Sequence, residues 1–211
     1  VYNFITGDQY GGHAYIFTAN TDTPGFIVNI AEPPVWSMYE AMTGEWILDI
    51  ANQSAGTLLT GENGEILSYS TSGGMLSLWN ASRCIQEGSW DQAFMVYTPL
   101  EIWRPPQGAT IDWNGGIEWS VPAATPGEFI NCISDDVLVT TFDLGGAFGV
   151  PGGAQTGWRV DTGYDANTGV KLWGPINRTL TPWVSLALYS VSGEGIYTEY
   201  NRNDLTITAY N

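Results

Sequence analysis

Oxygen-bearing side chains in the predicted turns are the first groups in this sequence that could do chemistry. The candidate calcium ligands are Asp135, Asp136, Asp161, Asp165 and Asn167. Carboxylate and amide oxygens are the ligands that Ca²⁺ prefers, so weak calcium binding is one hypothesis. The spacing of the last three does not match an EF-hand loop, and solvated turns are the simpler interpretation. We therefore predict no cofactor, with bound calcium as the possible exception.

The sequence does not favour catalysis. His13 is the only histidine, and it falls within a run that alternates like a strand, so a hydrogen-bonded strand histidine is the simpler interpretation. The sequence contains no Gly-x-Ser-x-Gly nucleophile elbow. With 22 acidic residues, carboxylate pairs can be drawn anywhere, so no pair is evidence for a hydrolase. We predict no catalytic residues.

The two cysteines, Cys84 and Cys132, leave two alternatives open. They lie 48 residues apart (132 − 84) and can form one disulfide, or they can be buried free thiols. The sequence has no Cys-x-x-Cys pair, so it supports neither a zinc ribbon nor covalently attached haem.

Three tryptophans mark the best candidate for a binding site. Trp90, Trp103 and Trp113 lie in or beside residues 86–112, which we predict to be a long surface loop. Exposed rings there could stack on sugars or anchor a protein partner, and the alternative is a loop lid packed on the domain. A second predicted loop covers the glycine-rich residues 144–155.

Three Asn-x-Ser/Thr sequons are candidate glycosylation sites, at Asn52, Asn80 and Asn177. Three is close to the number expected by chance from this composition. Asn52 and Asn177 lie near predicted strand ends and are better candidates than Asn80, which follows a strand tryptophan.

The net charge of −16 restricts the partners. With 22 acidic and 6 basic residues there is no basic stripe for phosphates, which argues against nucleic acid. Anionic lipid is disfavoured for the same reason. No apolar run approaches the roughly 18 residues that span a bilayer, so we predict no membrane insertion.

Short strands must position these side chains. Apolar and polar residues alternate over short runs bounded by Gly, Pro, Asn or Asp, which is typical of antiparallel sheets. Turn lengths group the strands into two complete units of four, at 57–121 and 129–173, and an incomplete unit at 184–210. The residues before 57 supply most of a first unit.

One hairpin sequence occurs twice. Residues 39–46 (YEAMTGEW) return as residues 164–173 (YDANTGVKLW), 125 residues later (164 − 39). That separation is close to three of the roughly 40–45 residues that a four-stranded propeller blade occupies. The acidic residue can accept backbone N–H bonds in the turn, and the glycine can take the left-handed conformation.

This hairpin pattern resembles the repeat of pyrroloquinoline-quinone-type β-propellers, and residues 64–82 resemble secreted archaeal proteins of that type. The resemblance implies four-stranded blades and a structural role for the acidic turn residue. Quinone dehydrogenases of that superfamily commonly carry an adjacent cysteine pair, which this sequence lacks, and their cofactor funnel needs more blades than 211 residues supply. The resemblance therefore supports the fold and not the quinone activity.

We expect an all-β, propeller-type array of about four to five blades, as a single domain over 1–211 or a fragment of a larger propeller. The predicted function is a non-catalytic structural or adhesion protein of the cell surface, with copies of itself or surface glycans as partners. The alternative is a ligand- or carbohydrate-binding propeller, or a propeller enzyme of quinone or hydrolase type. The last unit lacks a fourth strand, so residues 1–6 could fill its edge within one molecule or in a neighbour, giving a filament.

Overall fold

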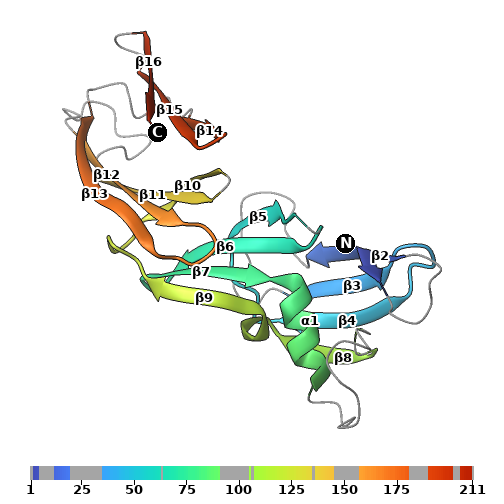
Figure 1. Cartoon of the computed structure of the whole chain (residues 1–211). Helices are drawn as coiled ribbons and strands as arrows, with labels where there is room; N and C mark the ends of the chain where they lie inside the picture. Colours follow the sequence, from blue (N-terminus) through green and yellow to red (C-terminus); the bar gives the residue numbers. More distant parts are fainter. Residues whose placement is uncertain are drawn as a thin grey trace, which may run out of the picture. The chain divides into compact units, whose positions relative to one another are not determined.

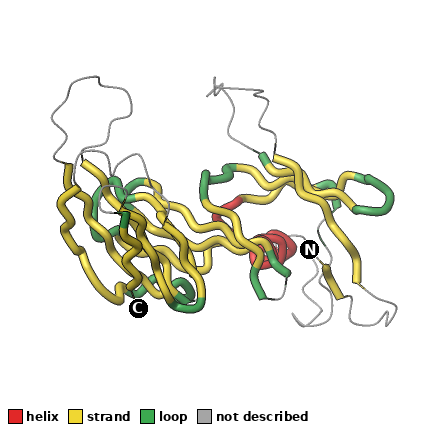
Figure 2. Tube along the Cα trace, turned by 90° about the horizontal axis from the view of Figure 1, so that it is seen from above, coloured by secondary structure: helices red, strands yellow, loops and turns green. Residues whose placement is uncertain are grey.

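The structure is a computed structural model. It describes residues 2–4, 12–19, 35–62, 64–90, 105, 107–134, 136–144, 157–180, 190–201 and 205–210. Most of these residues are in strands (Figures 1 and 2), as the sequence predicts. The chain divides into a first unit, Val1–Tyr69 with Leu78–Glu118, and a second unit, Ser70–Ser77 with Trp119–Asn211.

The first sheet has the order β1-β2-β3-β4-β8. Its strands are β1 (Tyr2–Phe4), β2 (Gly12–Ala19), β3 (Trp36–Glu40), β4 (Trp46–Ala51) and β8 (Ala109–Asp112). β1 to β4 pair antiparallel, whereas β8 pairs parallel with β4. Tyr2–Phe4 therefore belongs to the first sheet, and the filling of the last sheet's edge by residues 1–6, in the same or a neighbouring copy, stays a prediction.

The two complete groups of four strands that turn lengths predict, at 57–121 and 129–173, are confirmed as four-stranded antiparallel sheets. The second sheet contains β5 (Thr57–Thr60), β6 (Ile66–Ser72), β7 (Met75–Asn80) and β9 (Ile117–Pro122). The third contains β10 (Phe129–Ser134), β11 (Val137–Leu144), β12 (Gly157–Asp165) and β13 (Lys171–Leu180). The fourth has three strands, β14 (Ser190–Gly193), β15 (Ile196–Asn201) and β16 (Thr206–Tyr210).

A helix, α1 (Ala81–Trp90), corrects the prediction of a purely β chain with a loop over 86–112. Asn80 starts the helix, because its Oδ1 accepts hydrogen bonds from the backbone N–H groups of Ser82 and Arg83. Ala81, Cys84 and Ile85 lie on one face and are buried. The predicted loop also ends in strand β8, while residues 91–104 and 106 lie outside the described residues. Of the predicted loop 144–155, only Leu144 is described, at the end of β11.

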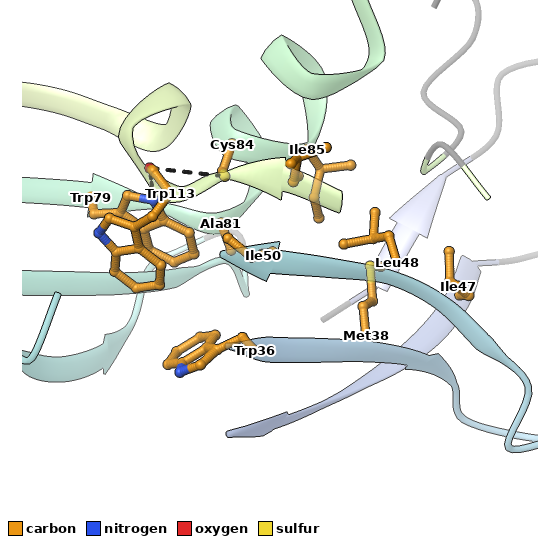
Figure 3. Close-up of a cluster of buried hydrophobic side chains, with 11 residues drawn as sticks. Trp36, Met38, Ile47, Leu48, Ile50, Trp79, Ala81, Cys84, Ile85 and Trp113 are labelled. Carbon is orange, nitrogen blue, oxygen red and sulfur yellow. Dashed lines mark hydrogen bonds between the residues drawn. The ribbon is translucent and has the colours of Figure 1, made fainter. Parts of the chain in front are cut away.

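The core of the first unit is built around three tryptophans (Figure 3). The rings of Trp79 and Trp113 stack in parallel with centroids 3.6 Å apart, and Trp36 meets both edge-on. Gly116 leaves room for this stack, since a Cβ added there would lie 2.3 Å from Nε1 of Trp79. Met38, Leu48 and other apolar side chains complete the cluster.

Candidate functional site

The first copy of the repeated hairpin forms a tight turn between β3 and β4. The Glu40 carboxylate accepts hydrogen bonds from the backbone N–H groups of Met42 and Thr43. The Thr43 hydroxyl accepts a hydrogen bond from the Glu45 N–H, and Gly44 has φ +72°. The acidic residue therefore holds the turn, as the sequence predicts.

The second copy, between β12 and β13, repeats the backbone N–H bonds to the acidic residue and to the threonine, and adds one bond from the threonine hydroxyl. The Asp165 carboxylate accepts hydrogen bonds from the N–H groups of Asn167 (3.0 Å) and Thr168 (2.8 Å) and from the Thr168 hydroxyl (2.8 Å). Gly169 has φ +70°. Donation from Thr168, through its hydroxyl and then its backbone, lowers the pKa of Asp165.

The lowered pKa of Asp165 predicts a pH-dependent stability. A carboxyl whose pKa is lower in the folded state stabilises the fold above its ordinary pKa, and this contribution is lost as the pH falls through the lowered value. We expect Asp165→Asn to lower the thermal midpoint near pH 7, and the difference from wild type to shrink below about pH 4. Thermal unfolding followed by circular dichroism across this range measures it.

Glu45→Gln is the matched control, because it removes one exposed carboxylate that takes no part in the turn through its side chain. Its midpoint difference should be small at every pH. A difference for Asp165→Asn that is equally large at pH 3 and pH 7 would contradict the assignment.

The calcium candidates are only partly brought together. The Asn167 side-chain amide donates to Asp136 Oδ1 over 2.9 Å, and the Asn167 backbone N–H donates to Asp165. Asp161 is fully buried elsewhere in the sheet, and Asp135 lies outside the described residues. Within the described part of the chain, no group of three or more His, Cys, Asp or Glu side chains is placed to hold a metal. Calcium binding at Asp136, Asp165 and Asn167 stays a prediction, and Asp161 has a different role.

That role is in a buried polar cluster that the sequence interpretation missed. Asp161 pairs with Arg159 through two hydrogen bonds, Nε to Oδ1 (2.7 Å) and Nη2 to Oδ2 (3.0 Å). The Thr141 hydroxyl also donates to Asp161 Oδ1 over 2.8 Å. Arg159 and Asn131 both donate to the hydroxyl of Tyr197, over 2.7 and 3.1 Å. We call these five residues the arginine cluster.

The arginine cluster fastens two sheets of the second unit to each other. Asn131, Thr141, Arg159 and Asp161 come from β10, β11 and β12, whereas Tyr197 comes from β15. Burial raises the pKa of Tyr197, so its hydroxyl stays protonated and neutral beside Arg159. The cluster joins the third and fourth sheets through charge-assisted hydrogen bonds.

A second buried pair links strand β12 to the segment that precedes β10. The Tyr164 hydroxyl donates to Glu128 Oε1 over 2.7 Å and accepts from the Ala124 N–H over 2.7 Å. Burial, followed by the hydrogen bond to Glu128, raises the pKa of Tyr164 to about 12. Nearby, the ring of Trp119 on β9 packs so closely on Gly169 that an added Cβ would lie 2.6 Å from it. The Tyr164–Glu128 pair and the Trp119 contact therefore hold strands and loops in place.

The tryptophan site is not supported at Trp113. Its ring is only 3% exposed and belongs to the core, which corrects the prediction of an exposed stacking residue. Trp90 ends α1 but its side chain is not among the described ones, and Trp103 lies outside the described residues. Sugar or protein binding by these two stays a prediction.

The structure distinguishes the three sequons. Asn80 caps α1 and donates to Glu118, so its amide is occupied. Asn52 is exposed, but its amide donates to Asp112 over 2.6 Å. Asn177 is exposed on β13, the last strand in the order of the third sheet. Asn52 and Asn177 are therefore exposed, whereas Asn80 is only partly exposed.

Both cysteines are free thiols, which is the second of the two alternatives. Cys84 donates to the Asp112 carbonyl, and burial raises the pKa of its thiol to about 12, so it is unreactive at neutral pH. Cys132 is partly buried on β10. His13 lies on β2 opposite Asn3, and its side chain is outside the described ones.

Comparisons with known proteins leave the family open. No family model matches the sequence, and no curated protein matches it significantly. In the described part of the chain, no helix combines the length and apolarity needed to cross a membrane.

Proposed function

We propose that this chain is a non-catalytic, β-propeller-type scaffold or adhesion module of the cell surface. The observation that carries the proposal is how the described ionisable groups are used. Glu40 and Asp165 hold turns, while the Arg159–Asp161 and Glu128–Tyr164 pairs are buried between strands and loops. Ionisable side chains in these positions stabilise the framework of the protein, which is the role that a scaffold requires of them.

Contacts between consecutive sheets support the propeller part of the proposal. In the second unit, Trp119 of β9 packs on the turn of the third sheet, and Tyr197 of β15 packs on Arg159 of that sheet. Aromatic side chains placed between neighbouring blades are what a propeller requires. An experimental map with sheets arranged radially about one axis is expected, and two face-to-face layers would contradict it.

The surface location is supported by composition: a net charge of −16, with Lys171 as the only lysine. The test is protease shaving of intact cells that express the chain, with its peptides identified by mass spectrometry. We expect them in the released fraction, together with added sugar mass on the peptide that contains Asn177. A cytoplasmic protein of the same cells is the control. Release of the peptides only after lysis would contradict the proposal.

A further inference from the structure

We propose that β16 is a dimerisation edge, which pairs antiparallel with β16 of a second copy of this chain. This inference rests on the proposed scaffold function and identifies a second copy of the chain as the binding partner. In the described residues the fourth sheet has the order β14-β15-β16, so its ladder ends at β16, while β14 lies beside β10 of the third sheet (Figure 1). An edge strand presents backbone N–H and C=O groups that can pair with another strand.

The exposure of β16 supports this assignment. Residues 205–210 are all exposed, and Leu205 and Ile207 expose 74% and 73% of their surface. Ile207 and Ala209 lie opposite Tyr200 and Thr198, whereas Tyr197 lies opposite Tyr210. Since residues directly opposite share a face, Ile207 and Ala209 point away from the arginine cluster. Their face also carries Ile196, which is 43% exposed.

Charge favours a second copy as the occupant. Two copies that each carry −16 repel, so a stable contact between them must use an uncharged surface. Residues 205–210 (LTITAY) contain no charged side chain. A basic partner, by contrast, would gain nothing from this strand compared with the acidic remainder of the surface.

The strand is also complementary to itself. When two antiparallel copies are centred on Thr208, that residue lies opposite its own copy, and Ile207 lies opposite Ala209 of the partner strand. Thr–Thr and aliphatic pairs are favourable cross-strand neighbours. A two-fold axis through Thr208 extends each three-stranded sheet into one of six strands. Such an isologous contact closes at the dimer and does not propagate.

The test is sedimentation of the 211-residue chain over a range of concentrations. We expect a reversible equilibrium between monomer and dimer, because one strand edge buries less than the roughly 1,200 Å² of stable complexes. The dimer fraction should rise with salt, as the Debye length falls from about 30 Å at 0.01 M to about 8 Å at 0.15 M. A chain that stays monomeric at every concentration and salt, or whose mass grows beyond the dimer, overturns the inference.

A charge swap tests the register. Ile207→Glu with Ala209→Glu places like charges opposite each other twice and should abolish the dimer. Ile207→Glu with Ala209→Lys places opposite charges there and should restore it. Met42→Glu with Val170→Glu adds the same net charge at exposed positions on other elements and should leave the dimer intact.

A doubly acidic variant that dimerises like wild type, or an acid–base variant that does not regain the dimer, overturns the assignment. Circular dichroism shows whether each variant is folded. If the doubly acidic variant does not fold, Ala209→Glu alone takes its place and should weaken the dimer. These results are independent of cell-surface shaving, so the dimer edge and the surface function can fail separately.

Discussion

Arg159→Met should lower the free energy of unfolding by about 3–5 kcal/mol, because it leaves the Asp161 carboxylate buried without its counter-charge. Asp161 has no exposed surface, and the Arg159 side chain is 8% exposed. The substitution also removes the hydrogen bond that Arg159 donates to Tyr197, which joins the fourth sheet to the third. Urea unfolding followed by circular dichroism measures the change.

Arg83→Met is the matched control. Arg83 pairs with Glu118 over 3.2 Å, but both side chains are substantially exposed, at 42% and 32%. Exposed ion pairs contribute about 0–1 kcal/mol, so the same substitution should cost little there. If the two arginine substitutions cost the same, Arg159 and Asp161 are not a buried pair.

A double variant separates charge from packing. Arg159→Met combined with Asp161→Leu removes both charges, and replacing a buried ion pair by apolar residues is often close to neutral. We expect this variant to be more stable than Arg159→Met alone. A double variant that is less stable than the single one would show that the hydrogen bonds to Thr141 and Tyr197 matter more than the charge balance.

The hairpins and sheets could be predicted from the sequence because their determinants are local. The acidic residue, threonine and glycine of each turn act within six residues, and strand alternation fixes which side chains share a face. The strand register shows that the two copies place their tryptophans at different positions. Trp173 lies opposite Gly163, and the corresponding pair in the first copy is Leu48 with Met38. Trp46 occupies the position of Lys171 and is half exposed.

Helix α1 and strand β8 could not be predicted, because tertiary contacts decide them. Four of the ten residues of α1 are strong helix formers, which does not stabilise so short a helix by itself, so the helix depends on the Asn80 cap and on burial of one face in the first core. β8 pairs with β4, which precedes it by about 60 residues in the chain. No local sequence pattern predicts a pairing between two strands so far apart in the chain.

One feature of the sequence could have predicted part of the arginine cluster. Arg159 and Asp161 are two residues apart on a strand, so their side chains share a face, and the strand also carries buried apolar residues. Opposite charges at this spacing on a buried strand favour an ion pair over a metal ligand. The contribution of Tyr197 has no such signal, because it comes from another sheet.

Trp113→Ala should lower the free energy of unfolding by about 3–5 kcal/mol, the usual cost of removing a buried tryptophan. The substitution removes the parallel stack with Trp79 and the edge contact with Trp36. The Trp113 backbone still accepts the 2.7 Å hydrogen bond from Nε1 of Trp79, so the loss is one of packing. Urea unfolding measures it, and the exciton couplet that two stacked indoles give in far-ultraviolet circular dichroism should disappear.

Trp46→Ala is the control for residue type. Trp46 is 45% exposed and donates one hydrogen bond to Asp49, so its removal should cost about 1 kcal/mol and leave the couplet unchanged. Equal costs for the two tryptophans would contradict the core placement of Trp113. A folded Trp113→Ala variant that keeps full stability but loses adhesion to a glycan-coated surface would instead restore Trp113 as a binding residue.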